Sequence, residues 1–509
     1  MIINVLDYLE GAVINHPHKV GFADQEHQIT FHELMQQAKS IGSHLAKLMG
    51  GQRNKPIIVM ADRQISSIIS FLGVLYSGNF YVPVDSQMPK KRLEIIFNNI
   101  NPDISVILKN DDKLLTDIKF AGRIVLLDDA IHEPVDEETL SSIRAKTIDT
   151  DPVYAVFTSG STGIPKGVLI NHRSVIDLVE QFTSVFQFSE KCIFANQAPL
   201  DYDGSVKDIY CTLKNGASMH IIPKSMFSFP IKLIHHMNEL KINTIIWATS
   251  ALRIIANLNA LEKEKPSSLE KILFTGEVMP NRVLNYFRKH YPAAMFVNLY
   301  GPTEITCNCT YFIVDRPFED GDSLPIGRPF PNTEILVINE KGKLVENDEE
   351  GEICVRGTSL ALGYYNNPQE TSRHFQENPL NPFYPEKIYR TGDIGKYNER
   401  GELMFISRKD SQIKHMGYRI ELGEIEVAAN SLGIVDIACC LYDQKNEKIV
   451  LFYQLQEMKD KEILLAMREL LPKYMLPTTL VHLPKMPLKD NLKIDRVKLR
   501  EDFINGNRP

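Results

Sequence analysis

Alternating strand and helix patterns in the first part of the chain constrain its fold most strongly. Residues 57–60 form a short apolar run of the buried-strand type, residues 65–76 have the pattern of a helix, and residues 79–84 form the next strand. Strands joined through helices pair in parallel, and helices cover both faces of such sheets. Apolar runs at 245–247, 272–274 and 295–297 continue the rhythm. The sequence therefore predicts an α/β protein with parallel or mixed sheets covered by helices.

A helix over residues 31–49 is indicated by signals at both of its ends. Thr30 and Glu33 have the spacing of a capping box, and Gly50 with Gly51 provides a stop.

The pattern changes in the last third of the chain. From about residue 327 to 406, short strands alternate with glycine turns, which predicts a β-rich subdomain. After Asp410 a new set of strands and helices begins, and it ends in a segment rich in Lys and Arg. We therefore expect a large N-terminal domain over 1–409 and a small, mobile α+β C-terminal domain over 410–509.

Composition excludes several broad classes of protein. The chain of 509 residues carries 57 Lys and Arg against 64 Asp and Glu, and the net charge of −7 gives no support to nucleic-acid binding. No apolar run reaches the ~18 residues of a membrane span, and the N-terminus has no basic leader. The seven cysteines lack the spacing of a zinc site and are typical of buried thiols in a reducing compartment. A cytoplasmic location is expected.

A loop of Gly, Ser and Thr at residues 157–167 follows an apolar strand. Its backbone N–H groups and hydroxyls can bind phosphate, and its single lysine can neutralise phosphate charge. The loop is not a Walker A motif, because Lys166 is followed by Gly167 and an apolar run and not by a helix. The next helix is expected to begin only after Ser174, as its N-cap.

This loop and four later segments, in the same order, resemble the adenylate-forming superfamily of acyl-CoA synthetases, luciferases and peptide-synthetase adenylation domains. The segments are 298–304 (Asn-Leu-Tyr-Gly-Pro-Thr-Glu), 389–393 (Tyr-Arg-Thr-Gly-Asp), 407–426 and 491–496 (Asn-Leu-Lys-Ile-Asp-Arg). The resemblance covers nearly the whole chain and implies ATP as a substrate with Mg²⁺ as the metal. The ATP-binding residues that it implies are Thr158, Ser159, Lys166, Asn298, Leu299, Tyr300, Gly301, Pro302, Thr303, Asp393, Phe405, Arg408 and Lys493.

The resemblance also implies individual roles. Tyr300 would stack on adenine, and Asn298 would bond its amino edge. Asp393 would accept both ribose hydroxyls, unless it is a solvent-facing turn residue. Catalysis would involve Thr303 at the α-phosphate and Glu304, whose hard oxygen ligands suit Mg²⁺.

Two further residues carry the implied reaction cycle. Lys493 would meet the negative charge that develops in the transition state. Asp410 would be the hinge about which the small domain rotates between adenylation and thiol transfer.

Asp203 points to an amino acid as the substrate. It stands where amino-acid adenylation domains have the carboxylate that pairs with the substrate α-ammonium, although it could merely cap the following helix. Ligases for fatty or aryl acids have no cation to meet there, and a buried unpaired carboxylate would be costly. The wider likeness is to stand-alone adenylation enzymes, among them the D-alanine–carrier protein ligases.

The implied pocket leaves the amino acid open. The substrate-binding residues are Asp203, Lys207, Thr275, Cys307 and Lys493, and the other positions of the pocket are Gly204, Ile246, Leu273, Leu299 and Asn308. Lys207 replaces an apolar residue of those ligases, and Thr275 replaces a cysteine. A lysine directed into the pocket favours an acidic side chain such as glutamate or aspartate, whereas one turned outward can pair with Asp201 or Asp208.

These observations predict an amino acid–carrier protein ligase that forms AMP. A small amino acid would react with ATP to give its adenylate and pyrophosphate, and then pass to the phosphopantetheine thiol of an acidic carrier protein. The chain ends sixteen residues after Lys493, so this carrier is expected on a separate protein. The alternatives are an acyl- or aryl-CoA ligase of the same superfamily and a catalytically silent nucleotide-binding relative.

Overall fold

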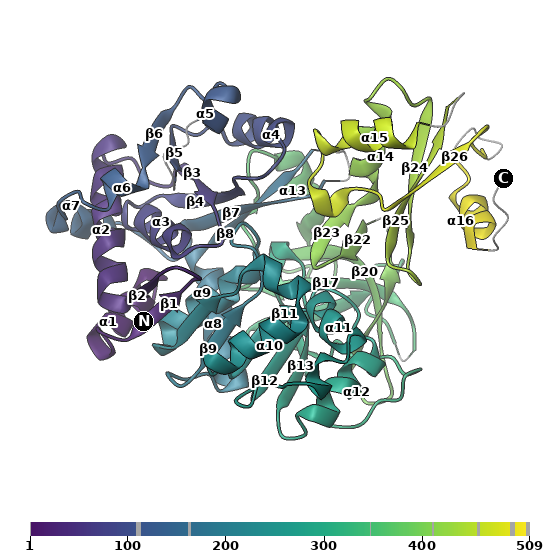
Figure 1. Ribbon diagram of the computed structural model, residues 1–509, viewed down its shortest axis with the longest axis horizontal. Helices are drawn as coiled ribbons and strands as arrows, with labels where there is room; N and C mark the ends of the chain where they lie inside the picture. The colour runs from purple at the N-terminus through teal and green to yellow at the C-terminus, as the bar shows by residue number, and fades with distance from the viewer. Residues whose placement is uncertain are drawn as a thin grey trace. The chain divides into compact units, whose positions relative to one another are not determined.

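The computed structural model describes residues 2–107, 113–160, 164–346, 348–409, 412–455, 459–488 and 494–504 (Figure 1). The chain divides into two compact units. The first consists of Met1–Ser86, Ile100–Phe157 and Gly167–Lys409, and the second of Gln87–Asn99, Thr158–Lys166 and Asp410–Pro509. Both units mix helices with sheets, so the predicted α/β class is confirmed.

A nine-stranded sheet forms one half of the first unit. Its order is β15 (Arg328–Pro329), β14 (Thr310–Ile313), β13 (Met295–Tyr300), β12 (Lys271–Thr275), β11 (Thr244–Ala248), β9 (Ile193–Asn196), β10 (Ser218–Ile221), β1 (Val20–Ala23) and β2 (Gln28–Thr30). The strands from β13 to β1 pair in parallel, as the alternating pattern predicts, and the edge strands are antiparallel.

Along the parallel strands, successive side chains face opposite sides of the sheet and pack into two different hydrophobic cores. Ile245, Trp247 and Phe274 face α10 (Pro230–Glu239), α11 (Thr249–Asn257) and α12 (Asn281–His290). Ile246 and Leu273 face the main core, which includes α8 (His172–Phe186) and α9 (Gly204–Asn215). Because both faces of the sheet are covered, its strands are apolar on both sides and only their ends can carry chemistry.

A second, seven-stranded sheet contains the other predicted strands. Its order is β18 (Gly363–Tyr364), β8 (Lys166–Asn171), β7 (Pro152–Thr158), β4 (Phe80–Asp85), β3 (Pro56–Ala61), β5 (Ile104–Ile107) and β6 (Arg123–Leu126). The surrounding helices are α1 (Leu6–Asn15), α2 (Phe31–Leu48), α3 (Ile65–Tyr76), α5 (Lys113–Asp117), α6 (Leu127–Ala130) and α7 (Glu137–Arg144). The capping box of Thr30 and Glu33 at the start of α2 is present, as predicted.

The N-cap predicted for the helix after the glycine-rich loop is wrong. Helix α8 begins at His172, and the side chain of Asn171 accepts a hydrogen bond from the N–H of Ser174 at 2.8 Å. Asn171 is therefore the cap, and Ser174 is a residue of the first turn. Both side chains can cap a helix, so the sequence pattern alone could not distinguish them.

The predicted β-rich region is an antiparallel sheet within the first unit. Its strands are β16 (Thr333–Ile338), β17 (Gly351–Gly357), β20 (Lys387–Tyr397), β19 (Phe375–Glu377) and β21 (Leu403–Arg408), and α13 (Pro368–His374) precedes β19. The long strand β20 pairs with β17, β19 and β21.

The second unit has its own small sheets and core. Strands β22 (Gln412–His415) and β23 (Tyr418–Glu421) form a hairpin, and β24 (Ile437–Asp443), β25 (Lys448–Gln454) and β26 (Thr479–Leu483) form a sheet. The helices are α4 (Lys90–Ile100), α14 (Leu422–Asn430), α15 (Asp460–Arg468) and α16 (Arg496–Ile504). Movement of residues 410–509 as a domain stays a prediction.

The structure also bears on the cysteines and on membrane-spanning helices. All seven cysteines lie within the described residues, where each is buried and none forms a disulfide. Among the helices that the structure describes, none is both long enough and apolar enough to cross a membrane.

Candidate active site

Several predicted site residues of the first unit lie at one edge of the nine-stranded sheet, and others lie on β20 and β21. Strands β9, β11, β12 and β13 run parallel and end at Asn196, Ala248, Thr275 and Tyr300. The carboxyl ends of parallel strands meet at the same edge, which is where open α/β sheets bind ligands. The segment with Asp203 follows β9, and the segment 301–304 follows β13, so the topology brings both to this edge.

Asp203 occupies the N-cap position of α9 but does not cap it. Its backbone has helical angles (φ −60°, ψ −23°), and its side chain makes no capping hydrogen bond. Asp203 is only 4% exposed. The alternative prediction of a simple helix cap is therefore wrong.

A strained turn brings Cys307 against Asp203. Thr306 and Cys307 both have positive φ, at 56° and 71°, which is costly for side chains of this kind. The turn is fixed by hydrogen bonds from Cys309 N to Tyr300 O at 2.8 Å and from Thr306 Oγ1 to Ser359 O at 2.8 Å. In this position the thiol of Cys307 donates to the carbonyl oxygen of Asp203 at 2.9 Å.

Gly301 is required by the close approach of the same turn. A Cβ atom at this position would lie 2.5 Å from Cα of Asn308 and 2.8 Å from the carbonyl oxygen of Cys307. The family resemblance predicted Gly301 as a nucleotide-binding residue, and the structure adds a packing reason for its lack of a side chain.

Electrostatic effects connect the buried groups around Asp203. Burial and the negative charge of Asp203 raise the pKa of the Cys307 thiol, and the positive charge of Lys207 opposes this. Burial, Cys307 and Asp203 likewise raise the pKa of Tyr154. Asn308 extends the group, since its side-chain amide donates to Thr275 Oγ1 at 3.1 Å. Cys307 therefore contacts Asp203, the neighbouring Asn308 contacts Thr275, and Lys207 acts on this group through its charge.

Asp393 is buried between two hydrogen-bond donors. It is 2% exposed, so the alternative of a solvent-facing turn is wrong. The hydroxyl of Tyr300 donates to Oδ2 at 2.5 Å, and the guanidinium of Arg408 donates to Oδ1. Asp393 and Arg408 are directly opposite each other in the pairing of β20 with β21, which explains their contact. No sequence pattern indicates the Tyr300 contact, since the two residues are 93 positions apart.

The other residues of the first unit that were predicted to bind ATP lie on β13, on β21 and in the turn after β13. The side chain of Asn298 donates to Pro325 O at 2.8 Å, which fixes the orientation of its amide. Leu299 and Pro302 are buried, and Phe405 is half-buried on β21 opposite Gly395.

Glu304 is a buried carboxylate that a tyrosine orients. Glu304 is 1% exposed and Thr303 is 2% exposed. The hydroxyl of Tyr364 donates to Glu304 Oε1 at 2.7 Å, and Ala361 N donates to Glu304 O at 2.9 Å. A carboxylate of this kind fits Mg²⁺, which takes one or two protein carboxylates together with phosphate and water oxygens. Sequence reasoning missed Tyr364, and no spacing relates it to Glu304.

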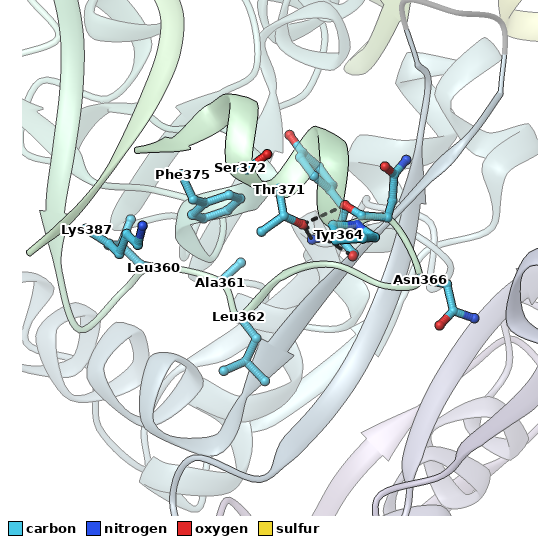
Figure 2. A pocket seen from close by; sticks show the side chains of 11 residues that line it. Leu360, Ala361, Leu362, Tyr364, Asn366, Thr371, Ser372, Phe375 and Lys387 are labelled. Carbon is cyan, nitrogen blue, oxygen red and sulfur yellow. Dashed lines mark hydrogen bonds between the residues drawn. The ribbon is translucent and has the colours of Figure 1, made fainter. Parts of the chain in front are cut away.

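Tyr364 also lines a cavity of about 620 Å³ (Figure 2). The lining residues are Leu360, Ala361, Leu362, Tyr364, Asn366, Asn367, Pro368, Thr371, Ser372, Phe375 and Lys387. Thr371 Oγ1 accepts a hydrogen bond from Tyr364 N at 2.9 Å, as Figure 2 shows. None of the predicted site residues that the structure describes lines this cavity. Its wall instead fixes the tyrosine that orients Glu304.

The described residues of the predicted phosphate loop between Thr158 and Lys166 group with the second unit. Ser159 Oγ donates to Arg419 O at 2.8 Å and accepts from Glu421 N at 3.2 Å, and Thr158 and Lys166 are buried. Lys493 and Asp410 lie outside the described residues, so their predicted roles stay predictions.

The chain is similar in sequence to a known enzyme family and to several known proteins. The family model described as "AMP-binding enzyme" matches residues 9–365. Tyrocidine synthase 1 of Brevibacillus parabrevis is 31% identical over 96% of this chain, but the match covers only 44% of that protein. The D-alanine–D-alanyl carrier protein ligase of Bacillus licheniformis is 31% identical, over 96% of this chain and 97% of the ligase.

A solved structure supports the same relationship at the level of the fold. The Vibrio cholerae adenylation domain AlmE, solved in complex with glycyl-adenosine-5'-phosphate, superposes with a TM-score of 0.84 at 19% identity, over 99% of this chain and 98% of that one. The family match over most of the chain and the full-length similarity to the ligase agree with the geometry of the sheet edge. The chain belongs to the family of AMP-binding enzymes.

Proposed function

We propose that this protein activates an amino acid as its AMP ester and transfers it to a carrier-protein thiol. In the first step the α-carboxylate oxygen attacks the α-phosphorus of ATP, and pyrophosphate leaves. In the second step the phosphopantetheine thiol of a carrier protein attacks the acyl carbon, and AMP leaves. Family membership and the similarity to a carrier protein ligase support this assignment.

The position of Asp203 is the observation that carries the proposal. Asp203 is buried in the segment that follows the carboxyl end of β9, and its side chain does not cap the helix that it precedes. Burial of a carboxylate is costly unless a cation and hydrogen-bond donors compensate it. The α-ammonium of an amino acid is a cation of the right kind, whereas fatty and aryl acids carry none.

The nucleotide is proposed to bind along the segment after β13 and the pair of β20 and β21. Tyr300 offers a ring face to adenine, and Asp393, held by Tyr300 and Arg408, accepts the ribose hydroxyls. Asn298 bonds the adenine edge. Thr303 binds the α-phosphate. Glu304 holds Mg²⁺, whose charge offsets that of the phosphates.

Other roles rest on the family resemblance. Thr158, Ser159 and Lys166 are proposed to bind the β- and γ-phosphates, and Lys493 to stabilise the charge of the adenylation transition state. Asp410 is proposed as the hinge that separates the two half-reactions. The Lys- and Arg-rich C-terminal segment would favour an acidic carrier protein.

Substrate-dependent exchange of pyrophosphate into ATP tests this function. The protein would be assayed with a panel of L- and D-amino acids and with a matched panel of fatty and aryl acids. Exchange with at least one amino acid and none with the other acids is expected. Exchange that depends only on fatty or aryl acids would contradict the proposal and support an acyl- or aryl-CoA ligase.

A further inference from the structure

We propose that the substrate is an amino acid with a carboxylate side chain, and that Lys207 is the counter-ion of this carboxylate. This inference rests on the proposed function, because it takes Asp203 as the partner of the α-ammonium. It goes further by assigning the class of amino acid.

Asp203 and Lys207 present opposite charges on the same side of α9. Lys207 is four positions after Asp203, so their side chains lie on one helical face, about 6 Å apart along the axis. An acidic amino acid carries an α-ammonium and a side-chain carboxylate separated by a few bonds. The ammonium would pair with Asp203 and the side-chain carboxylate with Lys207. Its α-carboxylate is left for the reaction with ATP.

Lys207 is buried and forms no ion pair within the part of the chain that the structure describes, although its charge acts on Asp208. It is 2% exposed, so its ammonium group is not directed into solvent. Within the described residues, no carboxylate oxygen lies within 4.0 Å of its ammonium group. A buried cation in this situation is costly and is normally paired. A carboxylate on the substrate would provide the missing charge.

The two acidic neighbours that could have neutralised Lys207 are poor counter-ions. Asp208 accepts a hydrogen bond from Asn196 at 2.7 Å, and consecutive residues of a helix point in different directions. Burial raises the pKa of Asp208 to about 7, and burial with the nearby charge of Asp85 raises that of Asp201 to about 7. Both carboxyl groups are therefore only partly ionised at neutral pH.

Lys207 lies within electrostatic range of the cluster around Asp203, as it does of Asp208. Its charge acts on the pKa of the Cys307 thiol, which contacts the backbone of Asp203. Through Asn308 the cluster continues to Thr275, whose oxygen accepts the Asn308 amide. The Thr275 hydroxyl is therefore free to donate its own proton to a substrate carboxylate. The Lys207 ammonium and the Thr275 hydroxyl would then both bind this carboxylate.

Pyrophosphate exchange with charged and uncharged amino acids of equal size tests this assignment. The values of kcat/KM would be compared for glutamate against glutamine and for aspartate against asparagine, in both chiral forms, together with glycine and alanine. The wild-type protein should prefer one acid over its own amide by at least ~100-fold, as expected for a buried ion pair. In Lys207→Met this ratio should fall to about one.

Lys214→Met is the matched control on the same helix. Lys214 pairs with Glu180 at 2.6 Å in the last turn of α9, away from the Asp203 cluster, so its loss should leave the wild-type ratio unchanged. Lys207→Arg keeps the positive charge and should retain a preference for the acid.

The outcomes separate this inference from the function on which it rests. Exchange with a neutral amino acid in preference to both acids would overturn the inference and leave amino acid activation standing. An acid preference that persists in Lys207→Met would overturn the role of Lys207. Exchange with no amino acid at all would reject the proposed function. If Lys207→Met does not fold, the wild-type ratio of acid to amide still decides the question.

Discussion

Single residues of the site are positioned by partners that are far away in the sequence. Glu304 is oriented by Tyr364, and Asp393 is held by Tyr300 and Arg408. The motifs predicted Glu304, Asp393 and Arg408, because each stands in a short segment typical of the family. Tyr364 could not be predicted, since its contact depends on how the segment at 358–364 returns to the end of β13.

Tyr364→Phe should weaken the use of Mg²⁺ while it preserves the fold. The hydroxyl is lost from Glu304 Oε1, and a hydrogen bond to a charged group contributes about 1.5–3 kcal/mol. The Mg²⁺ concentration for half-maximal exchange should therefore rise about tenfold or more. Tyr365→Phe is the matched control, because Tyr365 is the next residue and is only half-buried. Equal Mg²⁺ dependence in both variants would contradict the role of Tyr364.

Asp208 should make the protein less stable as the pH rises. Burial raises its pKa from 3.8 to about 7 in the folded state, so between about pH 4 and 7 the folded protein binds more protons than the unfolded chain. The free energy of unfolding contributed by this group is therefore highest at low pH and falls as the pH rises through that window. Asp208→Asn removes this contribution to the pH dependence of stability, because the amide does not titrate.

Thermal unfolding of wild type and Asp208→Asn between pH 5 and 8 checks this sign. The difference in Tm, variant minus wild type, should increase with pH, whatever its value at pH 5. A difference in Tm that stays constant or decreases with pH would contradict a raised pKa of Asp208 in the folded protein.

At the scale of elements, the parallel strands could be predicted and the turns between them could not. Runs such as 272–274 are apolar because both faces of the sheet are covered, and this leaves a clear signal in the sequence. The turn at 306–307 leaves none, because its positive φ values occur at a threonine and a cysteine and not at glycine. Tertiary contacts, and not local preference, impose this conformation.

Gly301→Ala should displace that turn. The added Cβ would lie 2.5 Å from the backbone of Asn308, so the turn must move and carry Cys307 away from Asp203. We expect a loss of about 1–3 kcal/mol in stability, as for other overpacked sites, together with a rise in KM for the amino acid. Gly321→Ala is the control, since a Cβ added there would have no described atom within 4 Å. Unchanged kinetics in Gly301→Ala would show that the turn does not shape the pocket.

At the scale of the whole molecule, the sequence predicted a division near residue 410 but not the composition of the second unit. Residues 87–99 and 158–166 group with 410–509 through contacts that no local pattern reveals. Arg92 of α4, for example, forms a buried ion pair with Glu424 of α14, 332 positions later. Such pairs depend on the folded arrangement, because each residue alone resembles any surface charge of a helix.

The most direct test of amino acid recognition compares the best amino acid substrate with its analogue that lacks the α-amino group. Pyrophosphate exchange would be measured for both acids with wild type and with Asp203→Asn, which keeps the size of the side chain. The wild-type protein should favour the amino acid by about 100-fold or more, and Asp203→Asn should lose most of this preference. Equal use of both acids by the wild-type protein, or an undiminished preference in Asp203→Asn, would contradict the assignment of Asp203 and with it the proposed function.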